Sequence, residues 1–558
     1  MATTSELNVT IVDGYVDEPA HFGVPPYIST YPRYTAGALV DAGVSPQNIF
    51  YHTIDALRQD SRRWINIENS DLVIYIGGMT VPGKYVGGTP AEPDEVRKIT
   101  WRAKGVSLLG GPIKFGVGSK NEGASDMHRD DLDYTFVAKG DVEAAAYDLV
   151  QQNLEGFSNR MRDNLEIQQW ASKGSFIVEH HPNHPNYLIC EIETSRGCPY
   201  RCSFCTEPLY GSKPTFRSIK SILQEISELY NFGIRHFRLG RQADILAYGG
   251  DGKRPSPSKL YDLYSGIHKV APELETLHLD NMNPITIANW PSKSSECLRT
   301  ISKFNTPGDT AAFGLESADP MVYEENNLNV TAEECLTAIE IVNQEAGWRP
   351  NENSLPKLLP GINFVHGLKG ETRKTFEYNK QFLKKIIDSG FLVRRVNIRQ
   401  VMAFPGTPMS STGASIAMGH KKLFQKYKQE VRLIFDHQML QRVAPVGTIL
   451  PNVHLEYFSG GSTFGRQLGT YPLLVGFPGE FPLGTTLDAI IVGHGQRSVT
   501  AIPLNLDLNT AKFSELMTIP GIGKKRAQTL LLNRPYTSIK EASNLVETDL
   551  SKFITIGP

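Results

Sequence analysis

The sequence has few cysteines, no long apolar run and no strong excess of either charge. Its 558 residues include six cysteines, and none of them precedes Cys190. So few cysteines in so long a chain do not predict a disulfide framework. No stretch approaches the roughly 20 apolar residues that cross a bilayer, and we therefore expect no membrane association. The formal net charge of −2 argues against wholesale electrostatic binding of nucleic acid, although a local basic patch remains compatible with it.

Internal repeats, low-complexity tracts and a secretory signal are also missing. Residues 1–7 are short and polar, without the basic flank and apolar segment of a signal peptide. We therefore expect a cytoplasmic, reducing location. Hydrophobic residues make up 40% of the chain and charged residues 21%, which is typical of a soluble globular protein. The length predicts three or four domains.

Three of the cysteines lie together, at Cys198, Cys202 and Cys205. The spacing C-x3-C-x2-C puts three thiolates on one short loop, where they can ligate three irons of a cubane 4Fe–4S cluster. The fourth iron is then open to a small molecule that can receive an electron. A structural zinc site needs four ligands, but no second C-x2-C occurs, and the nearest histidines, His181 and His184, lie upstream. The other three cysteines are expected to be ordinary buried thiols.

The cysteine run, with Phe204 before its third cysteine, resembles the signature of the radical S-adenosylmethionine (radical SAM) superfamily. The resemblance implies a 4Fe–4S cluster on these cysteines and S-adenosylmethionine bound at the open iron. It implies reductive cleavage to a 5′-deoxyadenosyl radical, which abstracts a hydrogen from the substrate. It also implies an electron donor such as ferredoxin or flavodoxin. Phe204 is expected to shield the cluster and to touch the adenine.

Later runs resemble the methylthiotransferase branch of this superfamily, and they occur in the same order over about 220 residues. The runs are 238–249, 315–318 with 326–327, 367–372 (where Lys369 replaces a family proline) and 404–408. The resemblance implies a cofactor-binding role for Gln242. A carboxylate such as Glu316 can accept hydrogen bonds from both ribose hydroxyls, with Ser317 nearby. Gly361 and Gly367 would let the backbone approach the adenine.

The carboxylate of S-adenosylmethionine calls for a guanidinium partner. Arg196, Arg238 and Arg399 are the candidates, and each is equally well interpreted as part of an ion pair at a strand end. Methylthiotransferases carry three further cysteines in their N-terminal domain, whereas residues 1–189 of this chain contain none. The resemblance therefore implies radical initiation but not methylthiolation.

Residues 1–150 are expected to form an α/β domain with a doubly wound parallel sheet, because short apolar strands that end in glycine turns alternate with helices. The run 22–27 is expected at the rim where such sheets bind ligands. At fold level the domain resembles the cobalamin-binding domain of many radical SAM enzymes. The D-x-H-x-x-G run that supplies the cobalt ligand is absent, since Asp131 replaces its glycine after 126–128, and cobalamin is not expected. Residues 151–186, rich in turn formers, are expected to be a linker.

Residues 187–443 alternate strands and helices in about six units, which predicts the partial (β/α)6 barrel of the radical SAM superfamily. Residues 444–505 hold short strands separated by glycine, which predicts a small β-barrel. This barrel resembles the RNA-binding, OB-like TRAM domain of methylthiotransferases. Its candidate contacts, which are otherwise solvated surface, are His454, Arg466, His494 and Arg497.

Residues 511–558 contain a run, Ile-Pro-Gly-Ile-Gly, that resembles a helix-hairpin-helix motif. Backbone N–H groups at the start of its second helix would bind a phosphate, and neighbouring basic side chains would add charge. The candidate nucleic-acid contacts are Gly521, Gly523, Lys524, Lys525 and Arg526. Packing or protein interaction is the alternative role. The overall layout resembles an archaeal radical SAM family with a C-terminal helix-hairpin-helix motif.

These observations favour a radical SAM enzyme that modifies a nucleic acid, RNA in particular. Two alternatives stay open. One is a radical SAM enzyme acting on a small metabolite, with a corrinoid as a further option. The other is a nucleic-acid-associated iron–sulfur redox sensor, although a sensor needs no S-adenosylmethionine pocket.

Overall fold

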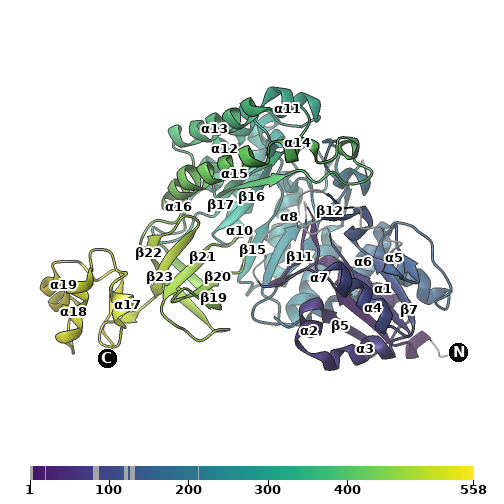
Figure 1. The fold of residues 1–558 in the computed structure, drawn as a ribbon, viewed down its shortest axis with the longest axis horizontal. Coiled ribbons are helices and arrows are strands. Elements are labelled where there is room, and N and C mark those ends of the chain that lie inside the picture. Colours follow the sequence, from purple (N-terminus) through teal and green to yellow (C-terminus); the bar gives the residue numbers. More distant parts are fainter. Residues whose placement is uncertain are drawn as a thin grey trace.

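The computed structural model describes residues 4–18, 21–78, 87–118, 124–125, 132–211 and 213–557. Along the chain it forms a parallel α/β domain, a partial β/α barrel, a closed small β-barrel and a helical C-terminal unit (Figure 1). This arrangement confirms the predicted fold class. No helix among these residues has both the length and the apolar character needed to cross a membrane.

The N-terminal domain has a five-stranded parallel sheet in the order β10-β7-β6-β1-β5. The strands are β1 (Val9–Asp13), β5 (Ile49–Thr53), β6 (Leu72–Ile76), β7 (Val106–Gly110) and β10 (Phe136–Val137). Every residue of β1 and β6 is buried, as expected for apolar strands covered on both faces. Helices α1 (Thr30–Asp41) and α5 (Val142–Gln151) cover one face. Helices α2 (Ile54–Gln59), α3 (Trp64–Asn69) and α4 (Pro93–Arg102) cover the other.

The predicted linker 151–186 is not a linker over its whole length, because it contains helix α6 (Asn164–Lys173). Asp163 caps this helix and forms a capping box with Glu166. The helix packs on α1 so closely that a Cβ added to Gly37 would lie 1.9 Å from the carbonyl oxygen of Trp170. The turn-forming residues at the end of the segment led the sequence prediction away from this helix.

The core is a partial barrel of six parallel strands in two sheets, with helices outside. The strands are β11 (Ile189–Glu193), β14 (His236–Gly240), β15 (Thr276–Leu279), β16 (Asp309–Glu316), β17 (Leu358–His366) and β18 (Arg395–Gln400). A bridge between Asn281 and Ala312 joins the two sheets. The main helices are α7 (Ile219–Asn231), α8 (Pro257–Val270), α10 (Pro291–Phe304), α12 (Ala332–Ala346) and α13 (Arg373–Asp388).

An additional short strand from the N-terminal region extends this barrel. Strand β4 (Tyr27–Ile28) pairs in parallel with β11. The sequence had suggested that the run 22–27 lies at the ligand-binding rim of the N-terminal sheet. The end of this run instead belongs to the edge of the core barrel. A backbone pairing between segments about 160 residues apart leaves no local sequence signal.

The small β-barrel closes through β19 (Ile449–Ser459), β20 (Ser462–Arg466), β21 (Leu474–Pro478), β23 (Ser498–Pro503) and β22 (Thr486–His494). The loop between β20 and β21, residues 467–473, packs against the strands of the partial barrel. There the Tyr27 hydroxyl donates to the carbonyl of Gly469, and the Thr470 N–H donates to His278 Nδ1 at 2.8 Å. The loop thereby fixes the small barrel against the core.

Helices connect the core to the small barrel and follow it at the C-terminus. The connection is α15 (Lys421–Val431), a π-helical turn (Arg432–Asp436) and α16 (His437–Val443). The C-terminal unit contains α17 (Phe513–Leu516), α18 (Lys524–Leu532) and α19 (Ile539–Val546). Its apolar side chains share one buried cluster with those of β22 and β23, so the unit packs against the small barrel.

Candidate functional site

The cysteine loop follows β11 at the carboxyl end of the barrel strands. Its entry is fixed by the Gly197 N–H, which donates to Glu207 Oε1 at 3.0 Å. Inside the loop, the N–H of Cys198 donates to the carbonyl of Gly211, and the N–H of Cys205 donates to the carbonyl of Cys202, each at 3.1 Å. The positive φ of Gly197, 87°, allows the tight turn before the first cysteine.

The three cysteines are free thiols in a desolvated setting. Burial raises the pKa of Cys198 to about 11 and that of Cys202 to about 12. Buried thiols of this kind become thiolates when a metal ligates them. Among the residues that the structure describes, no three His, Cys, Asp or Glu side chains converge as a single metal ion requires. In a 4Fe–4S cluster each thiolate ligates its own iron, whereas structural zinc needs four ligands, so three thiols on one loop fit a cluster better than zinc.

The cysteine loop is held by the matched run 326–327 and by Met409, which directly follows the matched run 404–408. Asn326 accepts from the Ser203 N–H at 2.9 Å through its carbonyl and from the Ser203 hydroxyl at 2.7 Å through its side chain. The Asn327 side-chain amide donates to the carbonyl oxygen of Arg201 at 3.0 Å. The N–H of Met409 donates to the carbonyl oxygen of Ser203 at 2.9 Å. The run 326–327 therefore positions the loop. Phe204 packs beside Cys202 against a small apolar cluster that contains Val322, Leu328, Leu368, Val401 and Met409.

Glu316 ends β16 in an unusual conformation and environment. Its φ is +63°, in the left-handed region that a residue with a side chain seldom adopts. Its Oε2 is buried and has no hydrogen-bond partner. Burial raises the pKa of this carboxyl group to about 8, against the opposing charge of Arg399. An orphaned carboxylate beside Cys202 fits a ligand that donates hydroxyl hydrogens.

The three arginine candidates differ in their partners. Arg196 makes a bidentate ion pair with Asp141, with distances of 2.6 and 2.8 Å. Arg238 pairs with Glu191 at 2.6 Å and also with Asp280. Arg399 has no hydrogen-bond or ion-pair partner for its side chain in the described part of the chain. The structure therefore favours Arg399 for the carboxylate of S-adenosylmethionine.

Gln242 and Ser317 are both buried, but their polar groups already have protein partners. The Gln242 amide accepts from the Thr194 hydroxyl at 3.2 Å and donates to the carbonyl of Leu239 at 2.9 Å. The Ser317 hydroxyl accepts from the N–H of Asp319 at 3.2 Å. In this structure both side chains stabilise the turns after β14 and β16, so a ligand would have to share or displace these bonds.

The two glycines also have different surroundings. A Cβ on Gly361 would lie 2.8 Å from Thr310 Cγ2, and Gly361 pairs with Ala312 in the amino-terminal half of β17. Gly361 therefore allows close strand packing away from the cysteine end. Gly367, with φ of +88°, follows β17 at its carboxyl end, and its N–H donates to Glu371 Oε2 at 2.8 Å.

Sequence reasoning missed the polar residues inside the barrel. Along the strands they alternate with residues that pack against the outer helices, so they face the interior of the barrel. The set comprises Glu191, Asp280, Asn363, Arg395 and Asn397. Asn397 Nδ2 donates to Asn363 Oδ1 at 3.3 Å across β17 and β18. Polar residues at alternate positions of β18, Arg395, Asn397 and Arg399, were the available signal.

The carboxyl end of the N-terminal sheet packs beside the cysteine loop. Phe115 and Tyr210 meet edge to face with ring centroids 5.1 Å apart, and Lys114 Nζ lies 4.7 Å from the Tyr210 ring. Burial lowers the pKa of Lys114 to about 8. The sequence candidates at 126–128 and Asp131 lie outside the described residues.

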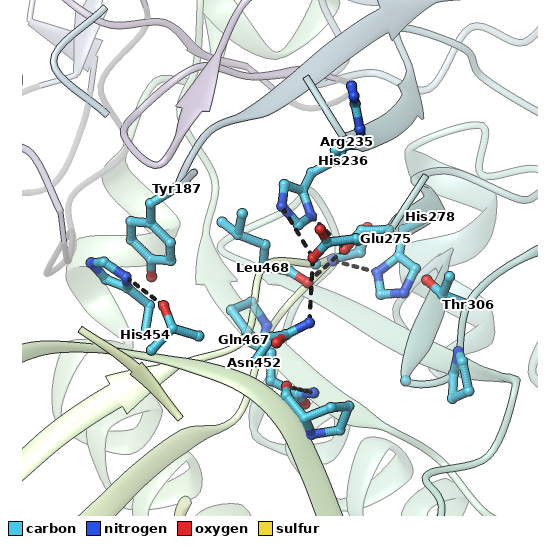
Figure 2. Close-up of a pocket in the computed structure, with 18 of the residues that line it drawn as sticks. Tyr187, Arg235, His236, Glu275, His278, Thr306, Asn452, His454, Gln467 and Leu468 are labelled. Atoms are coloured by element: carbon cyan, nitrogen blue, oxygen red, sulfur yellow. Dashed lines mark hydrogen bonds and ion pairs between the residues drawn. The ribbon is translucent and has the colours of Figure 1, made fainter. Parts of the chain in front are cut away.

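A cavity of about 530 Å³ lies at the opposite end of the core, between the amino ends of the barrel strands and the small barrel. His236, Glu275 and Asn452 point into it (Figure 2). The Asn452 amide donates to Glu275 at 3.3 Å, and His454 stacks on Tyr187 with centroids 3.7 Å apart. Its position separates this cavity from the cysteine loop.

The predicted nucleic-acid contacts fall into exposed and structural groups. Gly523 is the N-cap of α18, and Lys524 and Lys525 are exposed at its first turn. The Arg526 side chain donates to the carbonyl of Gly521 at 2.9 Å and braces the hairpin.

In the small barrel, all four predicted contacts have structural partners, since His454 stacks on Tyr187 and Arg497 Nε lies 3.6 Å from Asp436 Oδ2. Arg466 pairs with Glu456 at 2.6 Å, and His494 Nε2 lies 2.7 Å from the carbonyl oxygen of Ala444. Arg497 remains half exposed.

Comparison with known proteins places this geometry in a family. Residues 192–383 match the Radical SAM superfamily. An uncharacterized protein of Archaeoglobus fulgidus is 38% identical over 556 residues, covering 99% of this chain and 100% of that protein. The ribosomal protein uS12 methylthiotransferase RimO of Carboxydothermus hydrogenoformans is 25% identical over 271 residues, 47% of this chain and 55% of RimO.

Among solved structures, the chain is similar to TsrM, a radical S-adenosylmethionine methyltransferase of Kitasatospora setae. The TM-score is 0.49 at 15% identity, over 82% of this chain and 79% of TsrM. The family match and the two sequence relatives carry the assignment. The chain belongs to the radical SAM superfamily of enzymes, and its core is related to that of the methylthiotransferases.

Proposed function

We propose that this enzyme holds a 4Fe–4S cluster on Cys198, Cys202 and Cys205, cleaves S-adenosylmethionine reductively, and modifies a nucleic acid, with RNA favoured. The superfamily implies the cluster and S-adenosylmethionine. One observation carries the assignment to these residues. The orphaned carboxylate of Glu316 and the unpartnered guanidinium of Arg399 lie at the strand ends that also hold three free thiols.

The side chains have distinct roles in this proposal. Arg399 pairs with the carboxylate of S-adenosylmethionine, and Glu316 accepts from its ribose hydroxyls. Phe204 and the apolar cluster around it exclude water from the cysteine loop. When bound, the cluster supplies one electron to S-adenosylmethionine, which yields methionine and a 5′-deoxyadenosyl radical. An external donor such as ferredoxin or flavodoxin restores that electron.

The assignment of RNA as substrate rests on the C-terminal half. A closed small barrel and a helical hairpin follow the core, and α18 begins with exposed Lys524 and Lys525 at its N-terminus. Free N–H groups at a helix start and nearby lysines bind phosphate without reading sequence. RimO is named for a ribosomal protein, so a ribosomal protein is the competing macromolecular substrate.

Binding of total tRNA to the full chain tests the role of the hairpin. The double variant Lys524→Glu, Lys525→Glu is expected to lower tRNA affinity at least about ten-fold and to reduce the salt slope by about 0.7 for each phosphate that the protein no longer neutralises. The control is Lys540→Glu, Lys552→Glu, which makes the same charge change at exposed positions of the same unit. Equal affinities for the two double variants would reject the hairpin as a nucleic-acid contact.

A second candidate is radical chemistry on a small metabolite, assisted by a corrinoid at the N-terminal sheet. Contact between that sheet and the cysteine loop, through Phe115 and Tyr210, favours it. Tyr15 and Tyr75 are buried at the carboxyl ends of β1 and β6, however, and occupy space that a ligand at this rim would need. Our expectation remains that cobalamin is not bound. Cobalt retained with a corrinoid spectrum after reconstitution would contradict that expectation.

The redox-sensor alternative makes a different prediction. A sensor would exchange electrons without consuming S-adenosylmethionine. Formation of 5′-deoxyadenosine that disappears in Cys198→Ala would reject it.

A further inference from the structure

Five cations gather where the core, the connecting helices and the small barrel meet, and we call them the basic cluster. Arg394 and Arg395 lie at the start of β18, Lys428 lies on α15, Arg432 begins the π-helical turn, and Arg497 lies in the turn between β22 and β23. Three separate parts of the chain contribute to one region, because the charge of Arg497 acts on Arg394, Arg395, Lys428 and Arg432. Helical segments with π geometry occur frequently at functional sites.

Negative charge in this region is scarce. Asp436 ends the π-helical turn, and its Oδ2 lies 3.6 Å from Arg497 Nε. Asp436 is also the only carboxylate that forms an ion pair with any member of the basic cluster, within the residues that the structure describes. Nε atoms of Arg394 and Arg395 are buried and have no hydrogen-bond partner. Charges removed from water without a counter-ion are unfavourable, so this arrangement calls for an anion.

Two of the arginines are held in place by Tyr471. Arg394 donates to the carbonyl of Tyr471 at 2.8 Å, and the Arg395 guanidinium lies 3.9 Å from the centre of the Tyr471 ring. Stacking and a carbonyl fix the guanidinium groups without neutralising them. Arg395 Nη2 also donates to Asn397 Oδ1 at 3.4 Å, a neutral partner that leaves the positive charge uncompensated.

The cations are close enough to repel one another electrostatically. Burial and the neighbouring charges of Arg497 and Arg399 lower the pKa of Arg395. Burial and the charge of Arg497 also lower the pKa of Arg432. Arg395 shares one face of β18 with Asn397 and Arg399, and β18 is the edge strand of its sheet. The basic cluster therefore lies at the open edge of the partial barrel.

We propose that Arg395, Arg432 and Arg497 bind a phosphate group of the substrate at this edge. Guanidinium groups bind phosphate oxygens bidentately, and a phosphate supplies the negative charge that Asp436 alone does not. The inference rests on the proposed function and deepens it, because it gives the substrate of that function a phosphate group and binds it at the edge strand of the barrel, near the amino end of β18. An RNA phosphodiester and a phosphorylated small metabolite share this chemistry.

Inorganic phosphate is the probe, titrated calorimetrically into the full chain at constant ionic strength set with chloride. Arg497→Gln and Arg432→Gln are each expected to weaken phosphate binding about ten-fold or more. Asp436→Asn removes the competing carboxylate and is expected to tighten binding. The control Arg442→Gln removes the same charge from an exposed position on α16 and should leave binding unchanged.

Phosphate binding is expected to weaken in Arg497→Gln and Arg432→Gln but to tighten in Asp436→Asn. A purely structural role predicts weaker phosphate binding in all three variants, because each removes an interaction that stabilises this region. The inference is overturned if the wild-type chain binds no phosphate, if Arg497→Gln and Arg442→Gln bind it equally, or if Asp436→Asn weakens binding.

The same variants identify the source of the phosphate. Arg497→Gln that loses affinity for tRNA but not for a nucleoside monophosphate supports an RNA phosphodiester, and the reverse supports a small metabolite. No loss with either ligand overturns the site. The proposed function is assayed apart, by formation of 5′-deoxyadenosine. Phosphate binding without that product would reject the proposed function alone, whereas product without phosphate binding would reject the site alone.

Discussion

Charged residues inside the barrel divide into those with partners and those without. Arg238 is neutralised by Glu191 and Asp280, whereas Glu316 and Arg399 form no ion pair with any described residue. Arg399 is half-buried, whereas Glu316 Oε2 is fully buried, and a buried charge persists without a partner only where a ligand or a change of protonation compensates it. At the residue scale, this contrast separates the side chains that we propose to bind S-adenosylmethionine from the structural ones.

Replacing any of the three clustered cysteines by alanine should abolish stable cluster binding. A cluster that lacks one thiolate has a second open iron and dissociates or is oxidised readily. Iron and sulfide content after anaerobic reconstitution measures the outcome. Cys297→Ala is the matched control, because Cys297 is a fully buried thiol on α10. Full iron and sulfide in Cys202→Ala would contradict the ligand assignment.

Glu316→Gln should weaken binding of S-adenosylmethionine about ten-fold, which corresponds to about 1.4 kcal/mol for a lost charge-assisted hydrogen bond. Equilibrium dialysis with the reconstituted protein measures the affinity. Glu324→Gln, at an exposed position of the following helix α11 (Pro320–Glu325), serves as the control. If both variants bind S-adenosylmethionine equally, Glu316 does not contact the ribose.

Helix α6 shows how an element outside the core barrel stabilises the site. It packs on α1 through Gly37, and α1 in turn places Arg33 against the carbonyl of Glu191 in β11. Arg33 also pairs with Glu225 of α7, and both side chains are fully buried. At the scale of elements, the N-terminal domain and the core are thus joined by close helix packing and buried charge.

Gly37→Ala should destabilise the protein by about 1–3 kcal/mol, the usual range for overpacking, because the new Cβ would overlap the Trp170 carbonyl. Thermal unfolding of the full chain measures this loss of stability as a lower temperature of the first unfolding transition. Gly419→Ala, where an added Cβ meets nothing within 4 Å, should change stability by less than about 0.5 kcal/mol. An unchanged transition in Gly37→Ala would show that α1 and α6 do not pack as described.

At the scale of the whole molecule, local sequence patterns predicted the helices and strands. The way in which distant segments pair was seen only in the structure. Cysteine spacing indicated the loop, and alternating strands and helices predicted the core barrel, because both signals lie within short windows. The pairing of β4 with β11 and the ion pair of Arg196 with Asp141 join distant segments, so no window contains them. The choice of Arg399 over Arg196 and Arg238 required those partners to be seen.

The modules also have a functional order in space. The cysteine loop lies at the carboxyl ends of the barrel strands, and the basic cluster lies at the edge strand β18. The helical hairpin lies beyond the small barrel (Figure 1). The RNA substrate that we propose carries phosphates along its length, so it offers a phosphate both to the basic cluster and to the helical hairpin.

Formation of 5′-deoxyadenosine tests this account most directly. The protein is reconstituted anaerobically with iron and sulfide, reduced with dithionite, and incubated with S-adenosylmethionine in the presence or absence of total tRNA. We expect 5′-deoxyadenosine that increases with tRNA and is lost in Cys198→Ala. A verified 4Fe–4S protein that forms no 5′-deoxyadenosine would contradict the radical chemistry, and a yield unchanged by tRNA would contradict RNA as the substrate.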